Sequence, residues 1–134
     1  MLKSAIAIKA LPYQPTGILI TGFTTTPPQK EVAEAGGYEA KAIPSDAENI
    51  IFWVELFGLH KGDRLTLELF GPDKQRIANS QSILTGNKAA WFAYSGKHRK
   101  TDLWPKGIYS GLIRPERAGR VVVEEQREIQ VTQQ

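Results

Sequence analysis

Two neighbouring stretches in the middle of the chain restrict the fold more than any other feature. In residues 64–70, RLTLELF, leucines alternate with polar residues, the period-two pattern of a strand with one buried face. In residues 49–57, NIIFWVELF, apolar residues fill the even positions, and Glu55 alone interrupts the bulky odd positions from 51 onward. Such a strand is covered on both faces, so we expect it in the centre of a sheet.

Turn signals separate further strands on either side of these two. In Gly71-Pro72-Asp73-Lys74, proline presets the turn and aspartate can bond its own backbone, which predicts a hairpin. The expected strands are residues 16–24, 48–57, 63–70, 75–84, 88–95, 107–114 and 120–131, the last with a bulge where Glu124 and Glu125 interrupt it. About seven antiparallel strands predict an all-β, immunoglobulin-like sandwich, with a jelly roll or small barrel as the alternative.

The first 47 residues are less regular, and we expect them to pack on the same single domain as the main sandwich of residues 48–134. Residues 29–47 read as a connecting segment in which residues 31–35 form one helical turn, ended by Gly36-Gly37. The apolar run at residues 5–8 is interrupted by Lys9 before it reaches signal-peptide length. No stretch has the length and apolarity of a membrane-spanning helix.

Composition excludes several kinds of chemistry. The 134 residues include no cysteine, which removes disulfides, thiolate metal sites and cysteine nucleophiles. The two histidines, His60 and His98, lack the close spacing of metal ligands, and no serine has the surroundings of a nucleophile elbow. We therefore expect no enzyme activity, no metal and no cofactor. The net charge of +3 is mild and disfavours nucleic acid as a partner.

The stretch WPKGIYSG at residues 104–111 predicts a structural corner. Tyr109 stands early in the sixth expected strand, where a sandwich tyrosine bonds the backbone a few residues upstream. Pro105 and Gly107 supply the bend, and Trp104 can cover the end of the core. The alternative is that this stretch forms a ligand platform.

A basic loop flanked by aromatic residues is the candidate contact site. Trp91 and Tyr94 have opposite parity on their strand, so we expect one of them to face outward. Cations interleaved with aromatics can hold an anionic polymer, such as a cell-wall polymer, whereas a basic hairpin tip can also be simply solvated. The candidate residues are Trp91, Tyr94, Lys97, His98, Arg99, Lys100 and Trp104.

Residues 52–78, FWVELFGLHKGDRLTLELFGPDKQRIA, followed by NKAAWFAYSGKHRK and WPKGIYSGLIRPERAG, resemble the C-terminal sandwich region of bacterial lysostaphin-type peptidoglycan metallopeptidases. The resemblance covers about residues 48–123, and Lys74 departs from it where glycine is more common. It implies a non-catalytic part of those proteins, since their zinc ligands belong to a separate domain and match no position here.

The resemblance favours an accessory or binding module of a bacterial cell-envelope protein, periplasmic or secreted, with a peptidase domain or a cell-wall polymer as partner. Two alternatives belong to other classes. One is a structural assembly subunit of a phage or secretion system, whose exposed edge strand pairs with neighbours. The other is a carbohydrate-binding module with an outward aromatic strip formed by Trp91 and Trp104. The sequence indicates no particular oligomeric state.

Overall fold

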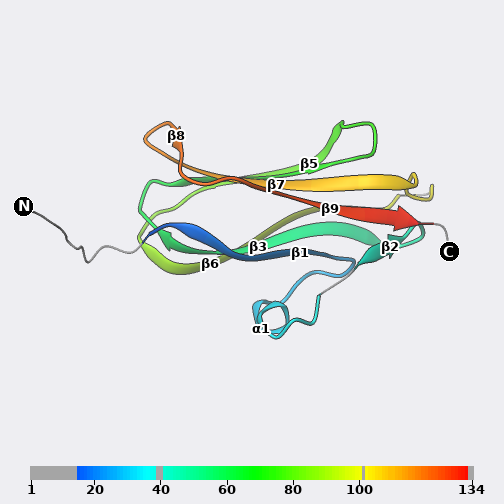
Figure 1. Ribbon diagram of the computed structural model, residues 1–134, viewed down its shortest axis with the longest axis horizontal. Coiled ribbons are helices and arrows are strands. Elements are labelled where there is room, and N and C mark those ends of the chain that lie inside the picture. The colour runs from blue at the N-terminus through cyan, green and yellow to red at the C-terminus, as the bar shows by residue number, and fades with distance from the viewer. Residues whose placement is uncertain (1–14, 39–40, 101, 133–134) are drawn as a thin grey trace, which may run out of the picture.

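In the computed structural model, the described residues, 15–38, 41–100 and 102–132, form two β-sheets packed face to face (Figure 1). One sheet has the antiparallel order β1-β3-β6, and the other has the order β2-β9-β7-β4-β5, with β8 paired to β7. The elements are β1 (Gly17–Thr24), α1 (Lys30–Glu34), β2 (Ala42–Pro44), β3 (Asn49–Leu59), β4 (Arg64–Phe70), β5 (Arg76–Ile83), β6 (Lys88–His98), β7 (Gly107–Arg117), β8 (Arg120–Val121) and β9 (Glu125–Thr132).

The all-β sandwich expected from the sequence is confirmed, and all seven expected strands are present. The helical turn also forms, as α1, and ends before Gly36. The run at residues 5–8 lies outside the described residues. In the part of the chain that the structure describes, no helix is long and apolar enough to cross a bilayer.

Three details differ from expectation. The sandwich is not purely antiparallel, because the short β2 pairs in parallel with β9; at three residues, it is too brief to leave an alternating pattern. The last expected strand is divided into β8 and β9 by a break at residues 122–124, which overlaps the predicted bulge only at Glu124. Residues 96–98, expected in a loop, continue β6, because the long β3 offers backbone partners as far as Asn49.

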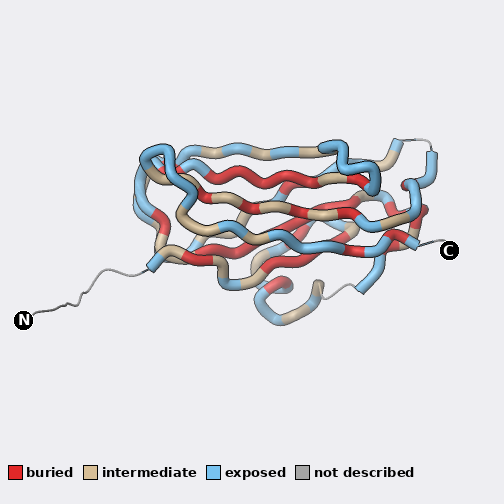
Figure 2. The backbone as a smooth tube through the Cα atoms, turned by 45° about the horizontal axis from the view of Figure 1, so that its top comes forward, coloured by how far each residue is buried: buried red, intermediate tan, exposed pale blue. Residues whose placement is uncertain are grey.

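The core lies between the two sheets, where inward side chains of both layers meet. Figure 2 shows the buried residues of the strands in red. Gly111 on β7 allows a close approach of the sheets, because a Cβ at this position would overlap the ring of Phe52 on the opposite sheet. The fully buried side chains that fill this space include Phe52, Val54, Leu56, Leu65, Leu67, Leu69, Tyr109, Ile113 and Val131. Each large apolar side chain buried in this way stabilises the fold by about 1.5–3 kcal/mol.

The outer face of β3 is covered as well. Trp53 and Glu55 point away from the core, yet each is only 2% exposed. The α1 segment (residues 29–38) lies against them, and the ring of Tyr38 meets the indole of Trp53 at 6.2 Å. Figure 1 shows α1 outside the β1-β3-β6 layer. The central strand predicted from residues 49–57 is thus buried on both faces.

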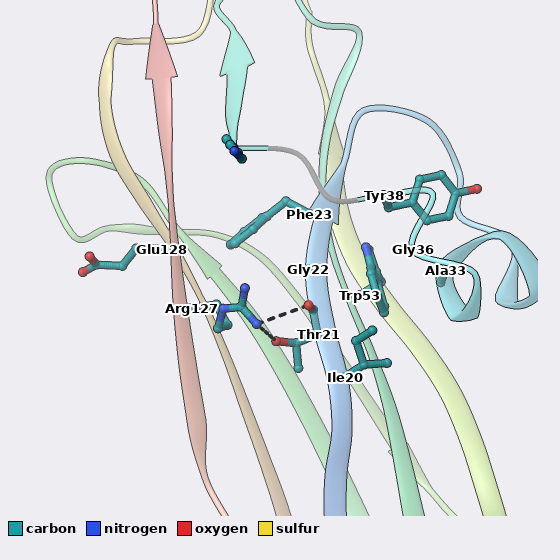
Figure 3. Close-up of a pocket in the computed structure, with 11 residues that line it drawn as sticks. Ile20, Thr21, Gly22, Phe23, Ala33, Gly36, Tyr38, Trp53, Arg127 and Glu128 are labelled. Atoms are coloured by element: carbon teal, nitrogen blue, oxygen red, sulfur yellow. Dashed lines mark hydrogen bonds between the residues drawn. The ribbon is translucent and has the colours of Figure 1, made fainter.

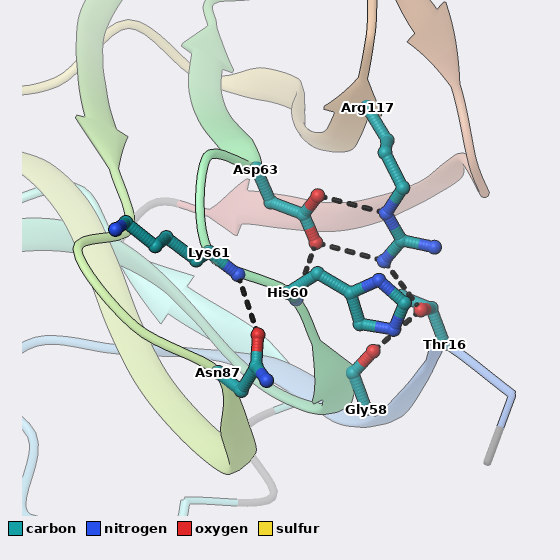
Figure 4. Close-up of polar contacts among 7 residues, drawn as sticks. All are labelled: Thr16, Gly58, His60, Lys61, Asp63, Asn87 and Arg117. Atoms are coloured by element: carbon teal, nitrogen blue, oxygen red, sulfur yellow. Dashed lines mark hydrogen bonds and ion pairs between the residues drawn. The ribbon is translucent and has the colours of Figure 1, made fainter. Parts of the chain in front are cut away.

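A polar cluster closes one end of the sandwich (Figure 4). The carboxylate of Asp63, fully buried after the β3–β4 turn, accepts two hydrogen bonds of 2.8 Å from the guanidinium of Arg117 and one from the N–H of His60. Arg117 also donates to the hydroxyl of Thr16, which donates in turn to the carbonyl of Gly58. The bonds from Arg117 hold the pKa of Asp63 below its ordinary value of 3.8, despite burial.

Glu55 is a second buried carboxyl, and its pKa is shifted upward, opposite to that of Asp63. Burial, and then the neighbouring carboxyl of Glu34, raise its pKa above the ordinary value of 4.5, while the charge of Lys30 has a smaller, lowering effect. The folded protein therefore holds this proton more tightly than the unfolded chain does. Its contribution to stability falls as pH rises from about 4.5 through the folded-state pKa.

The substitution Glu55→Gln removes this titration while keeping a polar side chain of similar size. We expect the variant to lose less stability than the wild type between pH 4.5 and pH 8, because no buried charge has to form. Thermal unfolding by circular dichroism across this range measures the difference. Glu31→Gln, at an exposed position of α1, is the control. Parallel curves for all three proteins would contradict the assignment.

Candidate functional site

The crossing from β6 to β7 is fastened to the chain that precedes β3. The main-chain N–H of Trp104 donates to the carbonyl of Ser45 at 2.9 Å, and its indole N–H donates to the carbonyl of Ala47 at 2.8 Å. The guanidinium of Arg99 donates to the same Ala47 carbonyl at 3.2 Å. These bonds place the ring of Trp104, only 9% exposed, over the end of the core.

Tyr109 completes the corner as predicted. Its hydroxyl donates to the carbonyl of Pro105 at 2.7 Å, and its ring meets Trp104 edge-on, with centroids 6.5 Å apart. Burial, together with the nearby carboxylate of Asp73, raises the pKa of Tyr109 to about 12. The hydroxyl therefore stays protonated and serves as a structural donor.

The hairpin turn between β4 and β5 lies directly beside this corner. Gly107 has a φ of +139°, and a Cβ there would come within 2.8 Å of Pro72, so glycine permits both the bend and the contact. Between turn and corner remains a hollow of about 260 Å³, which we call the corner pocket. It is lined by Gly71, Pro72, Asp73, Gln75, Ile77, Lys97, Trp104, Pro105, Lys106 and Tyr109.

The corner pocket combines apolar walls with a positive rim. Its walls are prolines, Ile77 and the two buried aromatic rings, and the side chains of Lys97 and Lys106 also line it. The single carboxylate, that of Asp73, already accepts the main-chain N–H of Gln75 at 3.0 Å. Such a hollow suits a small group that carries a negative charge beside an apolar part.

The structure brings only two of the candidate contact residues, Lys97 and Trp104, together in this pocket. His98 is exposed and has its ring nitrogen Nδ1 2.9 Å from the side-chain oxygen of Asn49. Arg99 is used in the corner itself, and Lys100 is exposed. The basic residues 97–100 therefore do not act as one group, because Lys97 lines the pocket, Arg99 makes a structural bond and Lys100 is exposed to solvent.

Trp91 and Tyr94 point to opposite faces of β6, as predicted from their odd and even positions on the strand. Trp91 faces inward and packs half-buried against the core, with the ammonium of Lys88 5.6 Å from its ring centre. Tyr94 faces outward and is 47% exposed, beside the ring of Phe92. Since Trp91 turns toward the core and Trp104 is buried, these two tryptophans form no common exposed strip.

The turn residues of the pocket, from Pro72 to Ile77, were not predicted as part of a site. Their turn was expected, but its position beside Gly107 depends on the pairing of β4 with β7, where Phe70 lies opposite Ser110. Alternation reports which face of a strand is buried and not which strand is its neighbour. The sequence Gly71-Pro72-Asp73-Lys74 marks this turn, but it does not indicate which other segment lies beside the turn.

No family model matches this chain, and no curated protein matches it either. Within the described ranges, no group of three His, Cys, Asp or Glu side chains is arranged to hold a metal ion.

Removing the hydroxyl of Tyr109 tests the corner. In Tyr109→Phe the ring stays in place while the bond to Pro105 is lost, so we expect a loss of about 1 kcal/mol in unfolding free energy. That corresponds to a melting temperature lower by roughly 3–5 °C for a domain of this size. Tyr94→Phe, which makes the same change on the outer face, should leave it within about 1 °C. Equal effects in a thermal melt would contradict the structural role of the corner.

Proposed function

We propose that this chain is a non-catalytic binding module of a bacterial cell-envelope protein, periplasmic or secreted, and that it accompanies a peptidoglycan peptidase. In this proposal the module holds cell-wall polymer through the corner pocket. The chain contributes recognition and positioning, and the chemistry belongs to its partner.

Strand order supports the immunoglobulin-like part of the proposal. The chain changes layer from β3 to β4, from β5 to β6 and from β6 to β7, while β4–β5 and β7–β9 stay paired within one sheet, in the manner of such sandwiches. The bond from Tyr109 to Pro105 is the corner device of the same folds. The resemblance of residues 48–123 to the sandwich region of wall peptidases supplies the cellular context.

The single observation that carries the binding role is the composition of the corner pocket. Peptidoglycan stem peptides present free carboxylates next to alanine methyl groups, which matches ammonium groups beside an apolar wall. Lys97 is the next-to-last residue of β6, just before the chain crosses to β7, and it lines the pocket. Because the rim charges are exposed to solvent, their attraction is modest and sensitive to salt.

The substitution Lys97→Ala tests this role. With purified peptidoglycan sacculi in a sedimentation assay at low salt, we expect the apparent Kd to rise about threefold to tenfold, because one ammonium–carboxylate contact is lost. Lys61→Ala is the matched control, since it removes the same charge just beyond the opposite end of β3. Equal binding by the wild type and Lys97→Ala, or equal losses in both variants, would overturn the proposal.

One observation favours the assembly alternative. Among the described strands β5 pairs only with β4, so it forms an outer edge of its sheet, and it carries the exposed Ile83. An open edge of this kind can add a strand from a neighbouring molecule. Sedimentation velocity at micromolar concentration separates the readings, because a wall-binding module needs no self-association whereas an assembly subunit forms dimers or larger species.

A further inference from the structure

A second hollow, which shares no lining residue with the corner pocket, opens at the free edge of β1. It has a volume of about 370 Å³ and lies between β1, β9 and the α1 segment. Figure 3 shows the indole of Trp53 on the α1 side of β1 and the guanidinium of Arg127 on the β9 side. We call this hollow the edge pocket.

An unpaired donor points to a ligand in the edge pocket. The indole Nε1 of Trp53 is buried, and it has no hydrogen-bond partner among the described residues. A buried donor without a partner costs about 1–3 kcal/mol, and tryptophan N–H groups normally find one. In contrast, the indole N–H of Trp104 is satisfied by Ala47.

Gly22 explains how this donor reaches the edge. The indole of Trp53 crosses beneath Gly22, and a Cβ at that position would lie only 3.1 Å from Nε1 and 2.8 Å from the ring carbon Cζ2. Because glycine has no side chain, the ring can extend from the central strand β3 toward the free side of the edge strand β1. The indole of Trp53 thus lines the hollow at this edge.

The charged groups of the pocket are mainly positive. Arg127 donates through Nη1 to the carbonyl and hydroxyl of Thr21, and its Nε and Nη2 make no hydrogen bond to any described residue. Lys41 lines the pocket as a second cation. Glu128 also lines the pocket, with its carboxylate on the far side of β9 (Figure 3). Glu125 accepts a hydrogen bond from the hydroxyl of Thr21 at 3.2 Å and lies 4.0 Å from Nη1 of Arg127.

We propose that the edge pocket binds a small carboxylate that carries an apolar group. The carboxylate oxygens accept hydrogen bonds from Trp53 and Arg127, and Lys41 adds charge attraction. The apolar group lies against Ile20 and the ring of Tyr38. Donors with no acceptor of their own, next to aromatic and aliphatic surface, are complementary to this class of ligand and disfavour its neutral amide.

Titration with benzoate and with N-acetylalanine, followed by the indole N–H signals in a two-dimensional proton–nitrogen NMR spectrum, tests the proposal. Trp91→Phe and Trp104→Phe identify which of the three tryptophan signals belongs to Trp53. We expect either acid to shift the Trp53 signal saturably, with a Kd on the order of millimolar or lower. The acid that binds more tightly identifies an aryl or a peptide-type carboxylate as the source.

Neutral isosteres and a charge variant complete the design. Benzamide and N-acetylalaninamide should produce no saturable shift, and Arg127→Gln should weaken binding of the acids about tenfold. Arg120→Gln, on the exposed β8, is the control and should bind as the wild type does. An unshifted Trp53 signal, equal binding of acid and amide, or unchanged binding in Arg127→Gln would overturn the proposal. The corner pocket is tested separately, by the binding of Lys97→Ala to sacculi. The result for the edge pocket therefore stands whether or not the corner pocket binds cell-wall polymer.

Discussion

The burial of β3 on both faces is the constraint from which the remaining arrangement follows. Phe52, Val54 and Leu56 require a second sheet on one side, and Trp53 requires a cover on the other. The second sheet is supplied by β4, β7 and β9, and the cover by the α1 segment. The α1 segment is therefore a third layer over the central strand, although its sequence alone resembles a connector.

Local patterns were sufficient to identify the longer strands, because alternation and turn residues are properties of neighbouring positions. Residues 64–70 alternate cleanly and form β4, and the Gly71-Pro72 turn leads into β5 as a hairpin. The bond from Tyr109 to Pro105 spans four residues, which is why a short motif could predict it. In each of these cases the interacting groups lie close together along the chain.

Long-range placement could not be predicted in the same way. β2 is three residues long and gains its position from β9, nearly ninety residues later, so no periodicity marks it. Both pockets likewise combine residues from separate regions, such as Ile77 with Trp104, or Trp53 with Arg127. The candidate residues Lys97 and Trp104 were identified individually, whereas the turn that faces them depends on sheet order. The open space beside Gly22 depends on a ring from the next strand, which no local signal reveals.

The cluster around Asp63 has a kinetic consequence. The hydrogen bond from Arg117 to Thr16 joins residues that are 101 positions apart, and it is made only when the first and the seventh strand are both in place. Closing so large a loop loses much chain entropy before any contact compensates for it, and proteins dominated by such distant contacts acquire their native state in milliseconds to seconds. The bond between Thr16 and Arg117 is therefore among the last that the chain can complete, and in a nascent chain it must wait until Arg117 has been synthesised, whereas β1 can already pair with β3.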